Sequence, residues 1–188
     1  MLAFLGERGQ GAMRTDEDLM LAAGGGDRSA FAEIVHRNHA RAFKLAARIV
    51  GDRDEAADVV QEAFLKILSS APRYRPSAAF GTYLYRVVAN LCLDRRRKSK
   101  PEPESEIDET GSELQSPLES LAAKQKAAVV RRALESLPAR QRLAVVLKYN
   151  EGLSYSEIAE VMDTSEKGVE RLLARARESL LAGLAVIR

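Results

Sequence analysis

Residues 153–180, "LSYSEIAEVMDTSEKGVERLLARARESL", combine two helix patterns with a tight turn between them. Ser154 is followed three residues later by Glu157, which is the capping box that starts a first, short helix. Residues 162–164 form the turn, and Ser165 caps a second helix. Two short helices joined in this way predict a helix-turn-helix, whose second helix can enter the major groove of DNA.

The second helix of this motif is predicted to have one apolar and one charged side. Val169, Leu173 and Ala176 are expected to face inward. Arg175 and Arg177 are expected to lie toward phosphates, and the residues nearer the start of the helix toward base edges. The predicted DNA-binding residues are Ser165, Lys167, Glu170, Arg171, Arg175 and Arg177. The alternative is an ordinary helical hairpin with a solvated charged face.

The rest of the chain predicts an all-α fold. Of its 188 residues 46% are apolar and only 5% aromatic. Strand-like alternation is hard to find along the chain, and residue types that favour helices dominate its composition. Thr15 followed by acidic residues starts a first helix, which "GGGD" at 24–27 breaks. Further helices are predicted at about 29–50, 53–69, 80–98, 118–136, 139–150, 154–162 and 165–184, with a loop at 69–79.

A polar segment divides these helices into two groups. Residues 99–117, "SKPEPESEIDETGSELQSP", contain three prolines and an acidic excess, which predicts a flexible linker. We therefore expect two small helical domains, 15–98 and 118–188, of which the second carries the helix-turn-helix. Residues 1–14 lack periodicity and are interpreted as a disordered tail, or as a misassigned start with Met13 as the true one.

Residues 80–98, "FGTYLYRVVANLCLDRRRK", predict a helix with two different faces. An apolar face at i, i+3, i+4 and i+7 is expected to be core, and it consists of Leu84, Val87, Val88 and Leu91. Another stripe carries Tyr83, Asn90 and Arg97, seven residues apart. A ring, an amide and cations can stack on unpaired bases, bond base edges and hold phosphates. The alternative is that the aromatics are core and the basic end is a solvated helix C-terminus.

No catalytic or cofactor-binding pattern is found. The single cysteine, Cys92, excludes an internal disulfide and is expected to be buried. His36 and His39 lie three residues apart without further ligands nearby, which favours ordinary histidines over a metal site. We therefore predict a protein that is not an enzyme and that has no cofactor and no metal. Because no apolar run reaches transmembrane length, we expect no membrane insertion and a cytoplasmic location.

Three stretches together resemble bacterial sigma factors of the sigma-70 family. "DRDEAADVVQEAFLKIL" (52–68) is similar to their polymerase-binding segment, and 80–98 to their promoter-melting and −10 segment. "LESLPARQRLAVVLKYNEGLSYSEIAEVMDTSEKGVERLLARARESL" (134–180) is similar to their −35 domain. The short two-domain plan resembles the extracytoplasmic-function (ECF) group. The match covers roughly residues 16–184.

The resemblance implies partners and site residues. The polymerase-docking residues would be Asp58, Gln61 and Glu62, which would contact the clamp helices of the largest subunit of core RNA polymerase, whereas Phe64 is expected to be core. The 70–79 loop would shape a pocket for a base flipped from the −10 strand. The −10 residues would be Tyr83, Arg86, Asn90, Arg95, Arg96, Arg97 and Lys98. An anti-sigma factor is an expected partner, and the acidic linker would enter the basic RNA path, unless it serves solubility alone.

Three positions depart from the family pattern. Tyr83 stands where the family often has Trp, so a ring remains for stacking. Glu170 and Leu172 stand where the −35 helix often has Lys and Arg, so no −35 consensus can be transferred. The alternative function is a conventional helix-turn-helix regulator with an N-terminal dimerisation or ligand module. Residues 52–98 distinguish the two, because a regulator needs neither the docking helix nor the stripe of ring, amide and cations.

Overall fold

The computed structural model describes residues 14–98 and 129–185, and every regular element in these ranges is helical, which confirms the predicted all-α class. The tail at 1–13, the linker at 99–117 and the first part of the helix predicted at 118–136 lie outside the described residues. The N-terminal module contains α1 (Asp16–Gly24), α2 (Arg28–Val50), α3 (Arg53–Ser70), the short 3-10 helix η1 (Ala71–Arg73) and α4 (Phe80–Lys98).

Local capping explains where the first helices begin and end. The Thr15 hydroxyl accepts from the backbone N–H of Asp18, whose carboxylate accepts from the backbone N–H of Thr15. Asp27 and Asp52 cap α2 and α3 with their carboxylates, which accept from backbone N–H groups in the first turn of each helix. Gly24 ends α1 where a Cβ atom would lie 2.4 Å from the Ala71 carbonyl oxygen. Only glycine therefore lets α1 pack this closely on η1.

The core of the N-terminal module follows the predicted stripes with two differences. Ile34, Val59 and Leu84 are fully buried where α2, α3 and α4 meet. Leu68, an apolar residue in the last turn of α3, is 43% exposed. Val87 is half-buried at the edge of the predicted core face. The predicted loop at 69–79 also begins later than expected, after α3 and η1.

The C-terminal module contains the predicted helix-turn-helix. A helical stretch at 129–135 is followed by α6 (Ala139–Tyr149), α7 (Tyr155–Val161) and α8 (Glu166–Ala185). Ser154 and Glu157 form the capping box of α7, and the Ser165 hydroxyl accepts from the Gly168 N–H at the start of α8. The turn passes through Asp163, whose φ of 48° is left-handed. Glycine tolerates that conformation best, and short polar residues such as Asp come next.

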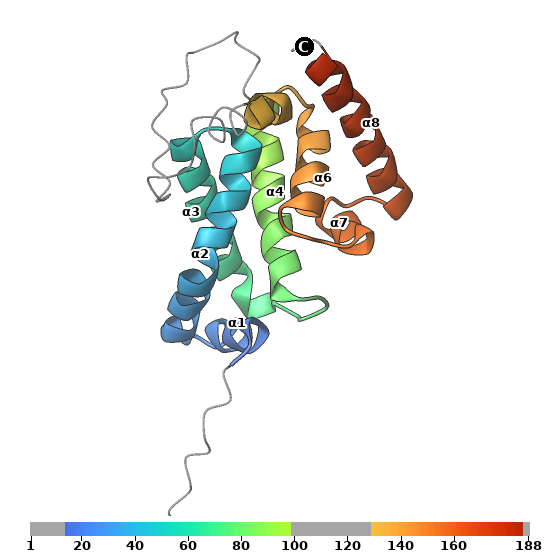
Figure 1. Ribbon diagram of the computed structural model, residues 1–188. Helices are drawn as coiled ribbons and strands as arrows, with labels where there is room; N and C mark the ends of the chain where they lie inside the picture. The colour runs from blue at the N-terminus through green and yellow to red at the C-terminus, as the bar shows by residue number, and fades with distance from the viewer. Residues whose placement is uncertain (1–13, 99–128, 186–188) are drawn as a thin grey trace, which may run out of the picture.

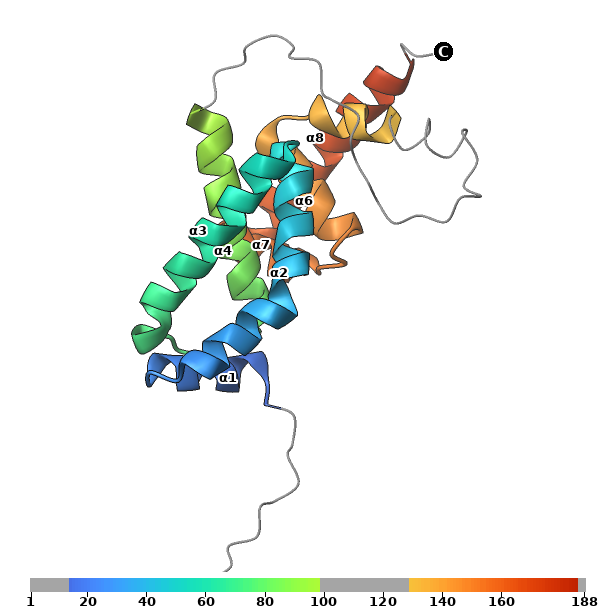
Figure 2. The same ribbon diagram turned by 90° about the vertical axis from the view of Figure 1, so that its left-hand side faces the viewer.

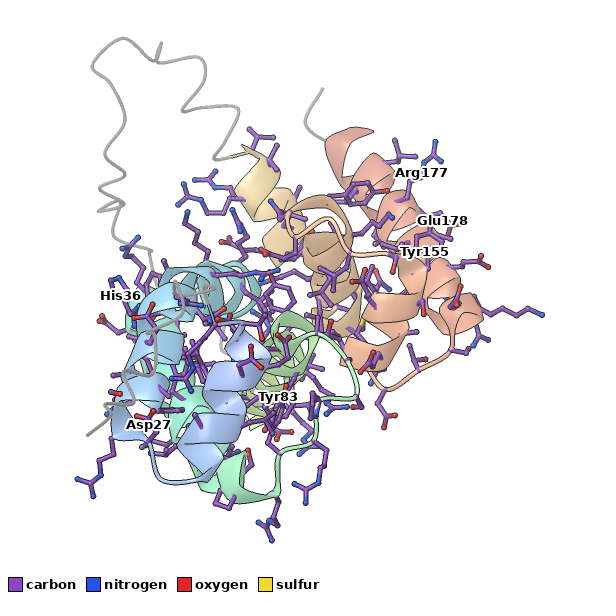
Figure 3. All side chains as sticks on the ribbon, turned by 90° about the horizontal axis from the view of Figure 1, so that it is seen from below. Asp27, His36, Tyr83, Tyr155, Arg177 and Glu178 are labelled. Carbon is purple, nitrogen blue, oxygen red and sulfur yellow. The ribbon has the colours of Figure 1, made fainter. Side chains whose placement is uncertain are left out.

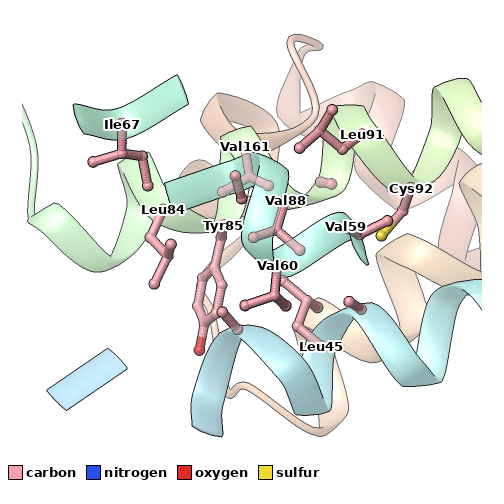
Figure 4. Packing of buried hydrophobic residues seen from close by; sticks show 14 of the residues in the cluster. Leu45, Val59, Val60, Ile67, Leu84, Tyr85, Val88, Leu91, Cys92 and Val161 are labelled. Atoms are coloured by element: carbon pink, nitrogen blue, oxygen red, sulfur yellow. The ribbon is translucent and has the colours of Figure 1, made fainter. Parts of the chain in front are cut away.

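The two modules pack against each other. Helix α4 lies between α2 and α3 on one side and α6 and α7 on the other, as Figure 1 shows, and Figure 2 views the chain from the side of α2 and α3. Figure 4 shows the consequence, because Val161 of α7 lies among the buried side chains of α4 and α3. Buried residues of both modules belong to one continuous apolar cluster. In the described parts of the chain, the two modules are therefore packed directly on each other.

Candidate nucleic-acid interface

The aromatic start of α4 is divided between the core and the surface. Phe80 and Tyr85 are each 1% exposed, as the alternative reading of these aromatics expected. Tyr83 is half-buried, and its hydroxyl lies 2.6 Å from the Ser70 hydroxyl. The guanidinium carbon of Arg86 lies 5.7 Å from the centre of the Tyr83 ring. Tyr83 is thus partly accessible, and its contacts with Ser70 and Arg86 orient the ring.

A pocket of about 290 Å³ lies beside Tyr83. Its lining includes Arg73 and Arg75 from the predicted 70–79 loop and Arg86 from α4. Tyr74 also lines it, and its buried hydroxyl has no hydrogen-bond partner among the described residues. Burial raises the pKa of Tyr74, so the hydroxyl stays protonated and can donate. Cations, a fixed ring and an unpaired donor suit a polar, flat, anionic ligand.

Asn90 and Arg97 lie on the same stripe of α4 as Tyr83. Asn90 is exposed, and the Arg97 side chain is 78% exposed while pairing with Asp94 at 3.2 Å. The stripe of Tyr83, Asn90 and Arg97 is therefore reachable from solvent along its length. The Lys98 side chain lies outside the described residues.

Two of the predicted −10 cations are engaged with other helices. Arg95 lies 3.7 Å from the Asp58 carboxylate and 3.4 Å from the Glu62 carboxylate, both on α3. Arg96 donates to the carbonyl oxygens of Ile49 and Val50 at the C-terminal end of α2. A cation at a helix C-terminus is favourable because it pairs with unsatisfied carbonyls. Arg95 and Arg96 thus hold the end of α4 against its neighbours.

The three predicted docking residues lie on α3. The side chains of Asp58 and Glu62 are 68% and 41% exposed, and Gln61 is also exposed. Lys66 and Arg95 lower the pKa of Glu62, with Lys66 as the larger cause. Phe64 is 6% exposed, which confirms that it is core.

A groove of about 410 Å³ between α2 and α3 adjoins these polar residues. Its lining is mostly apolar and includes Phe31, Val35, Gln61 and Leu65. Leu65 is 60% exposed. The sequence pattern did not identify this groove, although Leu65 falls on the same side of the helix as Gln61, which was a usable signal.

The predicted residues of α8 all lie on the surface. Glu166, Lys167, Glu170, Arg171, Arg175 and Arg177 are exposed, as is Ser165 at the cap, whereas Val169 and Ala176 are buried. Figure 3 shows Arg177 and Glu178 on the side of α8 that faces away from Tyr83. The structure therefore brings the predicted residues together as two separate faces, one on α4 and one on α8.

The contacts between the modules use residues that the sequence reasoning missed. Arg142 of α6 is 1% exposed and donates 2.9 Å to the Ile49 carbonyl of α2. Glu151 accepts from Arg48 at 3.3 Å and from the Tyr85 hydroxyl. A usable signal existed for Arg142, because it stands within the apolar stripe of its helix. No local pattern marks Glu151.

Comparison with known proteins decides between the two functions considered. Residues 34–102 match Sigma-70 region 2, and residues 127–180 match Sigma-70, region 4. The ECF RNA polymerase sigma factor SigM of Mycobacterium tuberculosis is 34% identical over 179 residues, which cover 89% of this chain and 83% of SigM. The chain belongs to the ECF group of the sigma-70 family. This sigma factor is also 33% identical to the ECF sigma-E factor of Escherichia coli over 88% of its own length and 92% of that relative.

Solved structures agree with this assignment. This sigma factor aligns with CnrH, solved in complex with the cytosolic domain of CnrY, with a TM-score of 0.67 and 28% identity over 91% of this chain and 97% of that one. The sigma factor RpoE of Bartonella quintana, solved with the anti-sigma factor NepR, has the same fold with a TM-score of 0.62 at 20% identity. The family matches and relatives support a sigma factor that recognises promoters with RNA polymerase, and they do not favour a conventional regulator.

Neither a membrane-spanning helix nor a metal cluster is found within residues 14–98 and 129–185. His39 lies beside Phe43 and Phe64, with ring centres 6.5 Å and 6.4 Å away. His36 is exposed on α2 (Figure 3).

Proposed function

We propose that residues 15–98 form sigma region 2, which binds core polymerase and the melted −10 strand, and that residues 118–188 form region 4, which binds the −35 element. Residues 99–117 would be the acidic connection between them. The family matches at 34–102 and 127–180 support this division. On this proposal the chain is not itself an enzyme. It lends promoter specificity to the polymerase in the cytoplasm.

The observation that carries the −10 assignment is the accessible edge of α4 beside the pocket at Tyr83. A flipped base would stack on the Tyr83 ring, and the Asn90 amide would bond a base edge. Arg86 and Arg97 are the better candidates for the DNA backbone, because their own contacts lie within α4, whereas Arg95 and Arg96 are engaged with α3 and α2. Lys98 would extend the cationic end of the helix.

Docking on the clamp helices of the largest polymerase subunit would use α3. Asp58, Gln61 and Glu62 supply polar contacts, and the groove beside Leu65 supplies apolar area. An apolar groove with a polar rim is the usual anatomy of a protein interface. Leu65→Ala and Asp58→Ala should therefore each weaken polymerase binding.

The −35 element would be read by α8. Lys167, Glu170 and Arg171 lie in its first turns, where recognition helices contact base edges. Ser165, Arg175 and Arg177 would contact phosphates at the two sides of the groove. The anti-sigma partner present in the RpoE structure supports a partner of the same class for this chain.

Transcription in vitro with purified core polymerase tests the function as a whole. Core polymerase with this protein should give discrete starts on genomic fragments, whereas core polymerase alone should not. Identical, non-specific products in both reactions would contradict the proposal. Mapping transcript starts after overexpression would then define both promoter elements.

Asn90→Ala tests the pocket assignment within that function. It should impair open-complex formation more than binding of a −35 duplex, because the amide meets only the unpaired strand. Asn150→Ala, at an exposed amide on the other module, is the matched control and should change neither measurement. Equal loss of both activities in Asn90→Ala would count against the pocket.

A further inference from the structure

The groove between α2 and α3 is an apolar surface that is open to solvent. Its volume is about 410 Å³, and its most buried lining residues are Val60 and Phe64, which are 1% and 6% exposed. Phe31 and Val35 of α2 are half-buried in its lining, and Leu65 of α3 is 60% exposed. Helices α2 and α3 lie side by side toward the viewer in Figure 2. Covering this surface with an apolar segment is favourable, because it removes the apolar area from water.

The described chain begins near this groove. The Arg14 carbonyl accepts from Arg37 of α2 at 2.8 Å, and the Arg14 guanidinium lies 3.7 Å from the Asp27 carboxylate. Arg37 is two residues away from both Val35 and His39, which line the groove on another side of the same helix. A helix with its side chains is about 10–12 Å across. The residues before Arg14 are therefore attached about one helix width from the groove.

The segment before Arg14 has two parts of different composition. Residues 1–5, "MLAFL", are all apolar and include Phe4. Residues 6–13, "GERGQGAM", contain three glycines and are mostly not apolar. Eight extended residues span at most about 26–29 Å, because each residue adds about 3.3–3.6 Å. The second part is therefore long enough to carry the first part around α2 to the groove.

The chemistry of residues 1–5 matches the lining of the groove. Most of this lining is apolar, and its two polar members are Gln61 and His39. The exposed carboxylate of Asp58 lies on α3 next to Ala57, which lines the groove, and residues 1–5 contain no carboxylate that it would repel. A short tether also gives the segment a local concentration of about millimolar, so that a modest intrinsic affinity is enough for docking. A partner in solution lacks this advantage.

We propose that residues 1–5 dock in the α2/α3 groove of their own chain and thereby compete with core RNA polymerase for it. The competition rests on the proposed docking role of α3, whereas the docking itself does not. Phe4 is the anchor, because an aromatic side chain buries a large apolar area. The polymerase must displace the segment, so its apparent affinity falls in proportion to the fraction of chains in which the groove is free.

Three forms of the protein separate the segment from its tether. The chain that begins at Met13 lacks the segment, and Phe4→Ser in the full chain removes only the anchor. Arg8→Ser is the matched control, because it changes a side chain of the tether and leaves residues 1–5 intact. All three changes lie outside residues 14–98 and 129–185, so the two helical modules keep their own residues.

Spin labels measure the docking directly. One label is placed at Gly6→Cys and the other at Ala40→Cys, an exposed position of α2 that does not line the groove. Cys92 is fully buried, and burial raises its pKa to about 12, so it should not be labelled. The labelled full chain should give a narrow distribution of distances, which becomes broad with Phe4→Ser and stays narrow with Arg8→Ser.

Two results would overturn the docking. One is a broad distribution of distances in the full chain that Phe4→Ser leaves unchanged. The other is a narrow distribution that is lost when the doubly labelled chain is diluted with unlabelled chain, because the segment would then lie in the groove of a second copy.

Binding to immobilised core polymerase, followed by surface plasmon resonance, measures the competition. The chain that begins at Met13 and the Phe4→Ser variant should bind about five-fold or more tightly than the full chain, and Arg8→Ser should bind like the full chain. Equal affinities of the full and shortened chains would overturn the competition. Leu65→Ala in the shortened chain tests the proposed docking role separately, because it should weaken binding even without the segment. If it does not, the polymerase does not use this groove, and the competition fails together with that role.

Discussion

The two helices assigned to promoter DNA present their polar side chains in different ways. On α8 the charged residues of the outer face are exposed and form no ion pair within the described residues. On α4 most of the corresponding cations already have partners in the chain, such as Asp94 for Arg97 and α2 carbonyls for Arg96. The α8 face can therefore attract duplex phosphates as it stands, whereas the α4 face must exchange internal contacts for DNA.

This difference predicts an order of events. Duplex binding through α8 is expected to need no rearrangement, while strand capture by α4 is expected to break the internal contacts of its cations. Because those contacts must be lost first, part of the energy of strand binding would be used to break them. The following predictions test that asymmetry.

The largest expected effect concerns stability. Leu84→Ala empties a fully buried site on α4, and such truncations cost about 2–5 kcal/mol. Leu181→Ala on α8, where the side chain is 60% exposed, should cost less than about 0.5 kcal/mol. Urea unfolding followed by circular dichroism measures both. Similar losses would show that α4 is not the packing centre of the two modules.

Removing the half-buried ring of Tyr83 should be the largest effect on strand binding. Tyr83→Ala should weaken capture of the unpaired −10 strand by about 1–3 kcal/mol, the usual value of one stacked base. Tyr83→Phe keeps the ring and loses only the hydroxyl contact with Ser70, so it should retain most of the affinity. Permanganate footprinting of the open complex reports both variants. If Tyr83→Phe weakens strand capture as much as Tyr83→Ala does, the hydroxyl rather than the ring carries the contact.

Recognition by α8 should divide between base and phosphate contacts. Arg171→Ala should cost about 1–3 kcal/mol and relax preference at one −35 position. Arg175→Ala should weaken binding to all duplexes alike and reduce the slope of log K against log salt concentration by about 1. Competition with single-base variants of the −35 duplex, at two salt concentrations, separates these outcomes. Identical behaviour of the two variants would place both side chains on phosphates.

The helix-turn-helix was predictable from sequence because its determinants are local. The Ser154 and Glu157 capping box, and the alternation of Val169 with exposed charges, all lie within a few residues of one another. The engagement of Arg95 was not predictable, because its partners Asp58 and Glu62 lie more than thirty residues away on another helix. A run of arginines looks the same in sequence whether its members face phosphates or carboxylates.

The packing of the two modules was the other feature that sequence reasoning missed. A polar linker predicts flexible separation, and nothing in residues 99–117 specifies whether the modules it joins also attract each other. That attraction depends on Glu151 meeting Arg48 and on Arg142 meeting the end of α2, which are contacts across about one hundred residues. Only the tertiary arrangement brings these groups together.

The smallest expected effect concerns acid stability at the start of α4. The Glu17 carboxylate accepts from the Phe80 N–H at 2.6 Å, and this hydrogen bond lowers the pKa of Glu17 below its ordinary 4.5. The stability that it provides is present above that value and is lost as the pH falls through the lowered folded pKa. Glu17→Gln should therefore cost about 1 kcal/mol at neutral pH and make unfolding less dependent on pH below 4.5. Urea titrations at several pH values would measure this, with Glu178→Gln as the exposed control. A variant that keeps the full acid dependence of the parent chain would show that Glu17 does not stabilise the start of α4.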